Sequence, residues 1–141
     1  MISFIVPAYN EEALIGRTIE SLNKAANEIG EPFEIVVAND ASTDRTAAIA
    51  ESQGARVVSV NRRHIAATRN EGARESIGDK LIFVDADTVV SHEVVRAAID
   101  AMNKGASGGG SAGRVSRRTC SFASVIGEAP WIMARASPSI G

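Results

Sequence analysis

The sequence has little of what marks several protein classes. Cys120 is its single cysteine, so an intrachain disulfide framework is excluded and a reducing, cytoplasmic compartment is expected. The 15 Lys and Arg residues do not outnumber the 17 Asp and Glu residues, and the formal net charge of -2 offers no broad basic surface to nucleic acid. The apolar start, MISFIVPAYN, is too short to span a membrane and lacks the basic flank of a signal peptide. We therefore expect no nucleic-acid partner and no transmembrane segment.

Apolar runs and helical patterns alternate along the first 104 residues. With 141 residues, 45% of them hydrophobic, the chain is large enough for one domain with a real core. Its four apolar runs are hydrophobic throughout instead of alternating with polar residues, which indicates a mostly parallel sheet covered by helices on both faces. The expected class is therefore α/β. The strands are expected at 2–7, 33–40, 55–60 and 81–87, and the helices at 12–30, 42–54, 65–78 and 91–105.

The composition changes at about Gly105. Residues 105–141 are rich in Gly, Ser and Arg and show no firm periodicity. We therefore divide the chain into a first unit, 1–104, and a poorly determined tail, 105–141. Composition favours a flexible connector at Gly108 to Gly110. The other interpretation is that these glycines allow the backbone to pack closely against another part of the protein.

Two carboxylates end the most apolar run, LIFVDAD. On a continuing strand, Asp85 and Asp87 would share a face with Cα atoms roughly 6.5 to 7 Å apart, which is wide for two ligands of one ion. Either a bend brings both to one ion, or one carboxylate binds the metal and the other a sugar hydroxyl. Carboxylate oxygens suit Mg²⁺ or Mn²⁺. The alternative is a solvated strand end, in which Asp87 caps the turn before the next helix.

Three further blocks accompany LIFVDAD, and two of them fall at the carboxyl ends of expected strands, where parallel sheets bind ligands. They are VPAYNEE at 6–12, VANDASTD at 37–44, and HIAATRNEGARESIGDK at 64–80. Together and in this order, the four blocks resemble the family 2 glycosyltransferases, whose nucleotide-sugar-binding half has the GT-A fold. The resemblance covers residues 2 to about 104 and implies a hexosyltransferase-type enzyme. Beyond it, the Gly108 to Arg114 segment resembles the family's glycine-rich strand.

By this resemblance, Pro7, Ala8 and Tyr9 would line the nucleobase pocket, and Glu11 would hold the base or ribose. A proline and an aromatic ring form a flat apolar slot, and a carboxylate accepts from ribose hydroxyls. Favourable charge in the first turn of a helix is the other interpretation of Glu11 and of Glu12.

The resemblance also implies roles for residues at the next strand ends. Asp40 matches the family's base-reading acid, which accepts a hydrogen bond from a uracil or guanine imino group. Asn39 departs from the common aspartate pair, so the base is left open. Arg69 matches an arginine beside the phosphates, and Asp85 with Asp87 would bind Mg²⁺ or Mn²⁺. Other residues are given structural or solvated roles: Asp44 in a turn, Asn70 and Gly72 in packing, and Arg62, Arg63 and His64 as solvated side chains.

The implied reaction is transfer of a sugar from a nucleotide diphosphate to an acceptor hydroxyl, by single displacement with inversion. Arg69 and the metal on Asp87 would stabilise the departing diphosphate. A general base would come from the acceptor side, which the tail represents only in part. There, Glu128 is the acid considered, with Trp131 as an acceptor platform. Family members often act on lipid-linked or envelope acceptors, so we expect such an acceptor and peripheral association with the inner membrane face.

Two alternatives stay open. The chain would be a non-catalytic nucleotide-sugar-binding module, or a truncated fragment of a glycosyltransferase, because the resemblance fades in the tail. Alternatively, LIFVDAD would belong to a haloacid-dehalogenase-like phosphatase, with Asp85 as nucleophile and Asp87 as acid/base. The phosphatase interpretation leaves VPAYNEE and VANDASTD unexplained.

Overall fold

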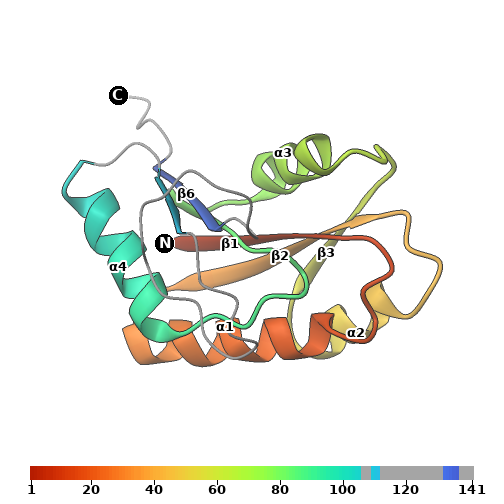
Figure 1. Ribbon diagram of the computed structural model, residues 1–141, viewed down its shortest axis with the longest axis horizontal. Coiled ribbons are helices and arrows are strands. Elements are labelled where there is room, and N and C mark those ends of the chain that lie inside the picture. Colours follow the sequence, from red (N-terminus) through yellow and green to blue (C-terminus); the bar gives the residue numbers. More distant parts are fainter. Residues whose placement is uncertain (106–108, 112–131, 137–141) are drawn as a thin grey trace.

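One sheet with helices on both faces forms the described part of the protein (Figure 1). The computed structural model describes residues 1–105, 109–111 and 132–136. The strand order is β3-β2-β1-β4-β6-β5, in which β1 to β4 are parallel and β6 is antiparallel to both its neighbours. The strands are β1 (Ile2–Ala8), β2 (Phe33–Asp40), β3 (Arg56–Val60), β4 (Lys80–Phe83), β5 (Gly109–Ser111) and β6 (Ile132–Ala136).

The helices divide between the two faces of the sheet. Figure 1 shows α1 and α2 along one face and α3 across the other, and α4 packs beside α1 and against β4 and β6. This arrangement confirms the expected α/β class and mostly parallel sheet. The helices are α1 (Ile15–Ile29), α2 (Thr46–Ser52), α3 (Ile65–Glu75) and α4 (His92–Asn103).

The central strand β1 is buried along its whole length, and this explains its unbroken hydrophobicity. Phe4 and Val6 belong to the core cluster that also contains the buried side chains of α1 and α4. Ile5 points the other way and contacts α3 at Gly72. Strands with two covered faces need apolar residues at every position, and β1 meets that requirement.

β1 runs one residue past Pro7, although the sequence predicts its end there. The carbonyl of Ile5 accepts from the N–H of Val84, so Pro7, two residues on, faces the same side. β4 ends at Phe83, so no ladder partner is lost where proline lacks an N–H. The divergence of β1 and β4 beyond this point leaves the carboxyl edge of the sheet open.

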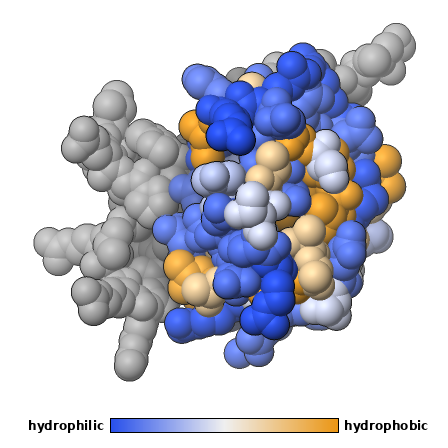
Figure 2. Space-filling view, turned by 90° about the vertical axis from the view of Figure 1, so that its right-hand side faces the viewer, coloured by the Kyte–Doolittle hydropathy of each residue, from blue (hydrophilic) through white to orange (hydrophobic). Residues whose placement is uncertain are grey.

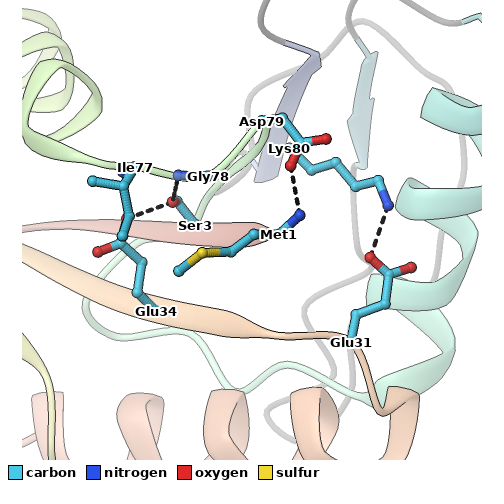
Figure 3. Close-up of polar contacts among 8 residues, drawn as sticks. All are labelled: Met1, Ser3, Glu31, Glu34, Ile77, Gly78, Asp79 and Lys80. Atoms are coloured by element: carbon cyan, nitrogen blue, oxygen red, sulfur yellow. Dashed lines mark hydrogen bonds and ion pairs between the residues drawn. The ribbon is translucent and has the colours of Figure 1, made fainter.

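A polar cluster fixes the opposite, amino end of the sheet (Figure 3). The hydroxyl of Ser3 donates to Glu34 at 2.6 Å and accepts from the N–H of Gly78 at 2.8 Å. Glu34 also accepts from the N–H of Ile77 at 2.7 Å, and Lys80 pairs with Glu31 on the other side. These contacts tie the α3–β4 connection to β1 and β2.

Part of the tail extends the same sheet. Gly109 and Gly110 lie in β5, so the connector interpretation is wrong for them, and the expected glycine-rich strand is confirmed over Gly109–Ser111. The division of the chain at residue 104 stays a prediction. Across the described segments, none of the helices combines the length and the apolar character needed to cross a membrane.

Candidate functional site

A cavity of about 390 Å³ opens at the carboxyl edge of the sheet, where β1, β2 and the start of α3 meet. Figure 2 looks onto this edge and shows hydrophobic side chains lying among hydrophilic ones. Tyr9 and Ile65, both in its lining, are 52% and 56% exposed. Large apolar side chains left open to solvent beside a cavity are typical of a ligand site. The lining residues are Pro7, Ala8, Tyr9, Glu11, Asp40, Arg63, His64, Ile65 and Thr68.

Asp40 is the buried acid of this cavity and is only 7% exposed. Its Oδ1 accepts from the backbone N–H groups of Arg62 and Arg63, at 2.8 and 3.2 Å, and its Oδ2 accepts from the Thr68 hydroxyl at 3.0 Å. Burial acts to raise the pKa of Asp40, but these three hydrogen bonds and the charge of Arg63 outweigh it and hold the pKa below its ordinary value. The carboxylate is therefore ionised and held in one position.

The loop between β3 and α3 forms one wall of the cavity. Arg63 and His64 are exposed, as expected of solvated side chains, and both also line the cavity together with Ile65 and Thr68. Arg63 has a φ of 49°, a left-handed conformation that is uncommon for a residue with a side chain. Its position after β3 was the available signal, because residues 61–64 follow a parallel strand. Thr68 lies one helical turn further on, and no sequence signal singled it out.

The Asp85–Asp87 segment forms a turn. β4 ends at Phe83, and the N–H of Thr88 donates to the carbonyl of Asp85, so the two carboxylates do not lie on a continuing strand. The hydroxyl of Thr18 holds the turn by donating to the buried carbonyl of Ala86 at 2.7 Å. Asp85 is half-buried and Asp87 exposed. The chain therefore bends at this strand end, and the shared metal site stays a prediction.

Arg69 and Asp85 form an ion pair of 2.6 Å between Nη2 and Oδ1. Both side chains are about four-fifths buried, at 20% and 22% exposure. The Nε of Arg69 is buried and has no hydrogen-bond partner in the described part of the chain. The Nε–H of Arg69 is therefore available to donate a hydrogen bond to a ligand at the carboxyl edge of the sheet. By contrast, Asn70 is exposed, so its expected packing role is wrong, while Gly72 does pack against β1.

Several carboxylates concentrate negative charge beside the cavity. The pKa of Glu11 is raised from its ordinary value, first by burial and then by the charges of Asp87, Asp44 and Asp85. Glu11 lines the cavity, so Asp85 and Asp87 act electrostatically on a lining residue although they are not themselves in the lining. A bound cation would relieve this repulsion.

The loops that carry Glu11 and Asp44 are tied together. The hydroxyl of Thr46 accepts from the N–H of Glu11 at 2.8 Å and donates to Asp44, whose other oxygen accepts from the N–H of Glu12 at 3.2 Å. Asp44 thus holds the turn into α2, as expected. α1 begins only at Ile15, so the first-turn interpretation of Glu11 and Glu12 is wrong.

A divalent cation fits the chemistry of this edge. Asp87 offers an exposed carboxylate whose one hydrogen bond within the described residues is a 3.4 Å contact from the Thr88 hydroxyl. Mg²⁺ is commonly held by one or two carboxylates together with substrate phosphates. No three His, Cys, Asp or Glu side chains in the described segments are grouped to hold one ion. Glu128 and Trp131, predicted for the acceptor side, lie outside the described residues.

Solved structures share this fold. Staphylococcus aureus TarS 1-349 in complex with UDP-GlcNAc matches with a TM-score of 0.69 and 28% identity, over 83% of this chain and 36% of that one. Glucosyl-3-phosphoglycerate synthase from Mycobacterium tuberculosis, in complex with Mn²⁺, UDP and glucosyl-3-phosphoglycerate, matches with a TM-score of 0.64 and 29% identity, over 83% and 45%. These likenesses confirm the expected GT-A fold.

Sequence comparison agrees with the structural one. The chain is 40% identical over 96 residues to the undecaprenyl-phosphate 4-deoxy-4-formamido-L-arabinose transferase of Pseudomonas aeruginosa, which covers 62% of this chain and 28% of that protein. The chain thus spans about a quarter of the length of that relative. The model of the family described as glycosyl transferase family 2 matches residues 3–127, and nothing in these matches supports the phosphatase alternative. The chain belongs to glycosyl transferase family 2.

Proposed function

We propose that this chain binds a nucleoside-diphosphate sugar and acts in the transfer of that sugar to an acceptor hydroxyl. The observation that carries the proposal is one edge of the sheet where an apolar cavity with a buried acid adjoins the Arg69–Asp85 pair and the exposed Asp87. A nucleoside diphosphate matches this arrangement, because its flat base and ribose suit the cavity and its charged diphosphate suits the adjoining charged residues. Family membership adds independent support.

The base and ribose would occupy the cavity. Pro7, Ala8 and Tyr9 supply an apolar wall, and the ionised Asp40 supplies a fixed acceptor. Glu11 lies on the side facing the charged cluster, where its carboxylate can accept from ribose hydroxyls. Because Pro7, Ala8 and Asp40 lie at the ends of β1 and β2 and the adjoining loops are held by hydrogen bonds, the site is formed before a ligand binds.

The diphosphate would lie against Arg69, Asp85 and Asp87. Charge decides what else is needed, because the carboxylates of Glu11, Asp85 and Asp87 outnumber the one guanidinium of Arg69 by two. A diphosphate carries further negative charge and would be repelled without a cation. Asp87, with Asp85, would hold Mg²⁺ or Mn²⁺, which when bound supplies Lewis-acid stabilisation of the leaving diphosphate. Arg69 would add hydrogen bonds to the same oxygens as charge develops on them.

We assign binding of the acceptor to the tail, residues 105–141, and the grounds for this assignment are family membership alone. Inverting transfer needs a base that removes the acceptor proton, and we propose Glu128 for this role with Trp131 as a platform. The name of the Pseudomonas aeruginosa relative points to a lipid-linked acceptor. We accordingly propose such an acceptor, with the chain working in the cytoplasm at the inner membrane face.

A second candidate function is binding without transfer. The chain spans 28% of the length of that relative, so the donor site is the part of the family machinery that the described residues account for. Incubation with UDP-sugars and GDP-sugars, Mn²⁺ and a lipid-linked sugar that carries free hydroxyls distinguishes the two functions. Release of nucleoside diphosphate together with a glycosylated lipid supports the transferase, and donor binding without either product supports the binding module.

The direct test of the donor site is metal-dependent nucleotide binding. We expect Mn²⁺ to strengthen UDP or GDP binding by at least about tenfold, because it neutralises repulsion between carboxylates and diphosphate. Asp87→Ala should remove that gain, as measured by calorimetry with and without Mn²⁺.

Asp100→Ala is the matched control, because Asp100 is an exposed acid on α4 outside the cavity lining. It should keep the full gain from Mn²⁺. Nucleotide affinities that do not change with metal, or an Asp87→Ala variant that keeps the gain, would contradict the proposed site.

A further inference from the structure

The segment that carries Asp85 and Asp87 continues past Phe83, the last paired residue of β4. After the N–H of Val84 donates to the carbonyl of Ile5, the chain leaves the sheet and runs beside α1 towards α4 (Figure 1). Residues 84, 86, 88 and 90 are buried, whereas the carboxylate-bearing residue 87 is exposed. The position of the Asp87 carboxylate therefore depends on contacts outside the strand ladder.

Two hydroxyls of α1 hold this segment. The Thr18 hydroxyl donates to the carbonyl of Ala86, the residue between the two carboxylates, at 2.7 Å, and this bond is buried. Three residues further along α1, the Ser21 hydroxyl accepts from the N–H of Val90 at 3.0 Å and donates to the carbonyl of Thr18 at 2.7 Å. The segment is therefore attached to α1 on both sides of Asp87.

Packing alone does not explain the hydroxyl of Thr18. The side chain lies on the buried face of α1 with 1% exposure, where valine would have the same shape and no polar group to satisfy. A threonine within a helix often bonds to the carbonyl four residues back. Here that carbonyl, of Leu14, is 3.4 Å away and already accepts from backbone N–H groups. Because a hydroxyl has one proton, Thr18 uses it in the shorter bond to Ala86.

The same end of α1 also holds the part of the cavity wall that carries Glu11. The carbonyl of Glu11 accepts from the N–H groups of Leu14 and Ile15, at 3.0 and 2.9 Å. Glu11 lines the cavity, and its pKa is raised by burial and then by the charge of Asp87. One end of one helix thus sets the position of the turn relative to the cavity.

We propose that Thr18 and Ser21 are positioning residues that align the Asp87 carboxylate with the cavity, so that one nucleotide reaches the cavity and the metal together. Neither residue is in the cavity lining, and both act through the backbone of the turn. A nucleoside diphosphate has a limited reach, so a displaced turn should lose the contacts made through the metal while the cavity contacts stay. This inference rests on the proposed function and names what its metal dependence requires.

Thr18→Val removes the hydroxyl and keeps the shape of the side chain. The test is calorimetric titration with UDP and GDP, each with and without Mn²⁺, and with uridine and guanosine, which carry no phosphate. The gain in diphosphate affinity from Mn²⁺ should fall about tenfold, since residues that orient metal ligands contribute at least that much. Nucleoside affinity should not change, and Thr18→Ser, which keeps the hydroxyl, should retain the gain.

Ser21→Ala removes the second attachment at a half-buried position, where a substitution disturbs the fold less. It should lower the gain from Mn²⁺ in the same direction, and it carries the test if Thr18→Val does not fold. Ile35→Val is the matched control for lost stability, because Ile35 is 4% exposed in the core and lies near the amino end of β2. It should keep the whole gain.

The outcomes separate this inference from the proposed function. A full gain from Mn²⁺ in Ser21→Ala or in folded Thr18→Val would overturn the inference and leave the proposed donor site standing. Equal losses of nucleoside affinity and of the gain in Thr18→Val would indicate a purely structural role and would also overturn it. A chain without substitutions that gains nothing from Mn²⁺ would count against the proposed function itself.

Discussion

Arg69 carries two signs of a group prepared for a ligand. Its Nη2 is 2.6 Å from Asp85, and its buried Nε has no partner in the part of the chain that the structure describes. An unpaired buried donor costs about 1 to 3 kcal/mol, so a bound phosphate oxygen would recover free energy there. The same guanidinium neutralises Asp85, which limits the negative charge that an approaching diphosphate meets.

Arg69→Met separates these two roles. Loss of the guanidinium should weaken UDP binding in Mn²⁺ by about 10- to 100-fold, the range expected for charge-assisted hydrogen bonds. Binding of Mn²⁺ alone should not weaken, because Asp85 loses its neutralising partner. Calorimetry with metal alone and with metal plus UDP measures both quantities.

Arg74→Met is the control on the same helix, since Arg74 is exposed and pairs with Glu71 at 2.9 Å. It should leave both affinities unchanged. Equal weakening of metal and nucleotide binding in Arg69→Met would indicate that the substitution disrupts the turn that holds Asp85 and Asp87.

The sequence predicts which residues belong to the site where a charged side chain directly follows an expected strand. Asp40 and Asp85 follow apolar runs, so their place at the carboxyl edge follows from the parallel sheet. The position of Arg63 after β3 was predictable in the same way, but its left-handed backbone was not, because it arises from the turn that brings two N–H groups to Asp40. That geometry depends on a contact 22 and 23 residues away, which local pattern does not contain.

The elements themselves were largely predictable, and their ends were not. The four parallel strands and four helices follow from apolar runs and helical spacing. β4 ends at Phe83, three residues after it begins, and the hydroxyl of Thr18 on α1 donates to the carbonyl of Ala86 in the turn that follows. β5 and β6 lie within a segment that shows no firm periodicity, and the pairing of β6 with β4 and of β5 with β6 depends on tertiary contact.

Helix α3 lies close to the sheet because Gly72 has no side chain. A Cβ at this position would lie 2.6 Å from Cγ2 of Ile5 and 3.2 Å from Cβ of Ala38. Cγ2 of a β-branched residue moves little, since χ1 of isoleucine is restricted. The close approach also sets the position of Thr68 and Arg69, one turn earlier on α3.

Gly72→Ala should therefore destabilise the protein, although alanine normally gains about 1 kcal/mol over glycine within a helix. Overpacking against β1 should lower the free energy of unfolding by about 1 to 3 kcal/mol in urea titration. Asn70→Ala, at an exposed position of the same helix, should change it by no more than about 0.5 kcal/mol. A stabilised Gly72→Ala would show that α3 does not pack this closely.

At the scale of the whole molecule, carboxylates hold both ends of the sheet. Asp40 fixes the wall of the cavity at the carboxyl end, and Glu34 ties β2 to the α3–β4 connection at the amino end (Figure 3). Burial acts to raise the pKa of Glu34, but hydrogen bonds from Ser3, Ile77 and Arg56 lower it below the ordinary value of 4.5. The pKa of Asp40 is likewise below its ordinary 3.8.

These shifts predict that acid unfolds the protein. Because the unfolded chain binds protons at higher pH than the native state does, the stability from Glu34 and Asp40 is present above about pH 4.5 and is lost as the pH falls through the lowered values. The pKa of Glu11 is raised, so its ionisation opposes folding as the pH rises. The free energy of unfolding should therefore be nearly level around neutral pH and fall below about pH 4.5.

Glu34→Gln should flatten this acid limb, because the amide keeps acceptors for Ser3 and Ile77 and has no proton to take up. Glu20→Gln is the control, since the Glu20 side chain is exposed on α1 and forms no hydrogen bond or ion pair within the described segments. Glu11→Gln should act with the opposite sign and stabilise the protein near neutral pH, because it removes a charge that burial disfavours and that Asp87, Asp44 and Asp85 repel. Urea titrations between pH 3 and 7 would measure all three, as a series of about five pH values. An acid limb as steep in Glu34→Gln as in Glu20→Gln would show that the amino end of the sheet does not depend on that carboxylate.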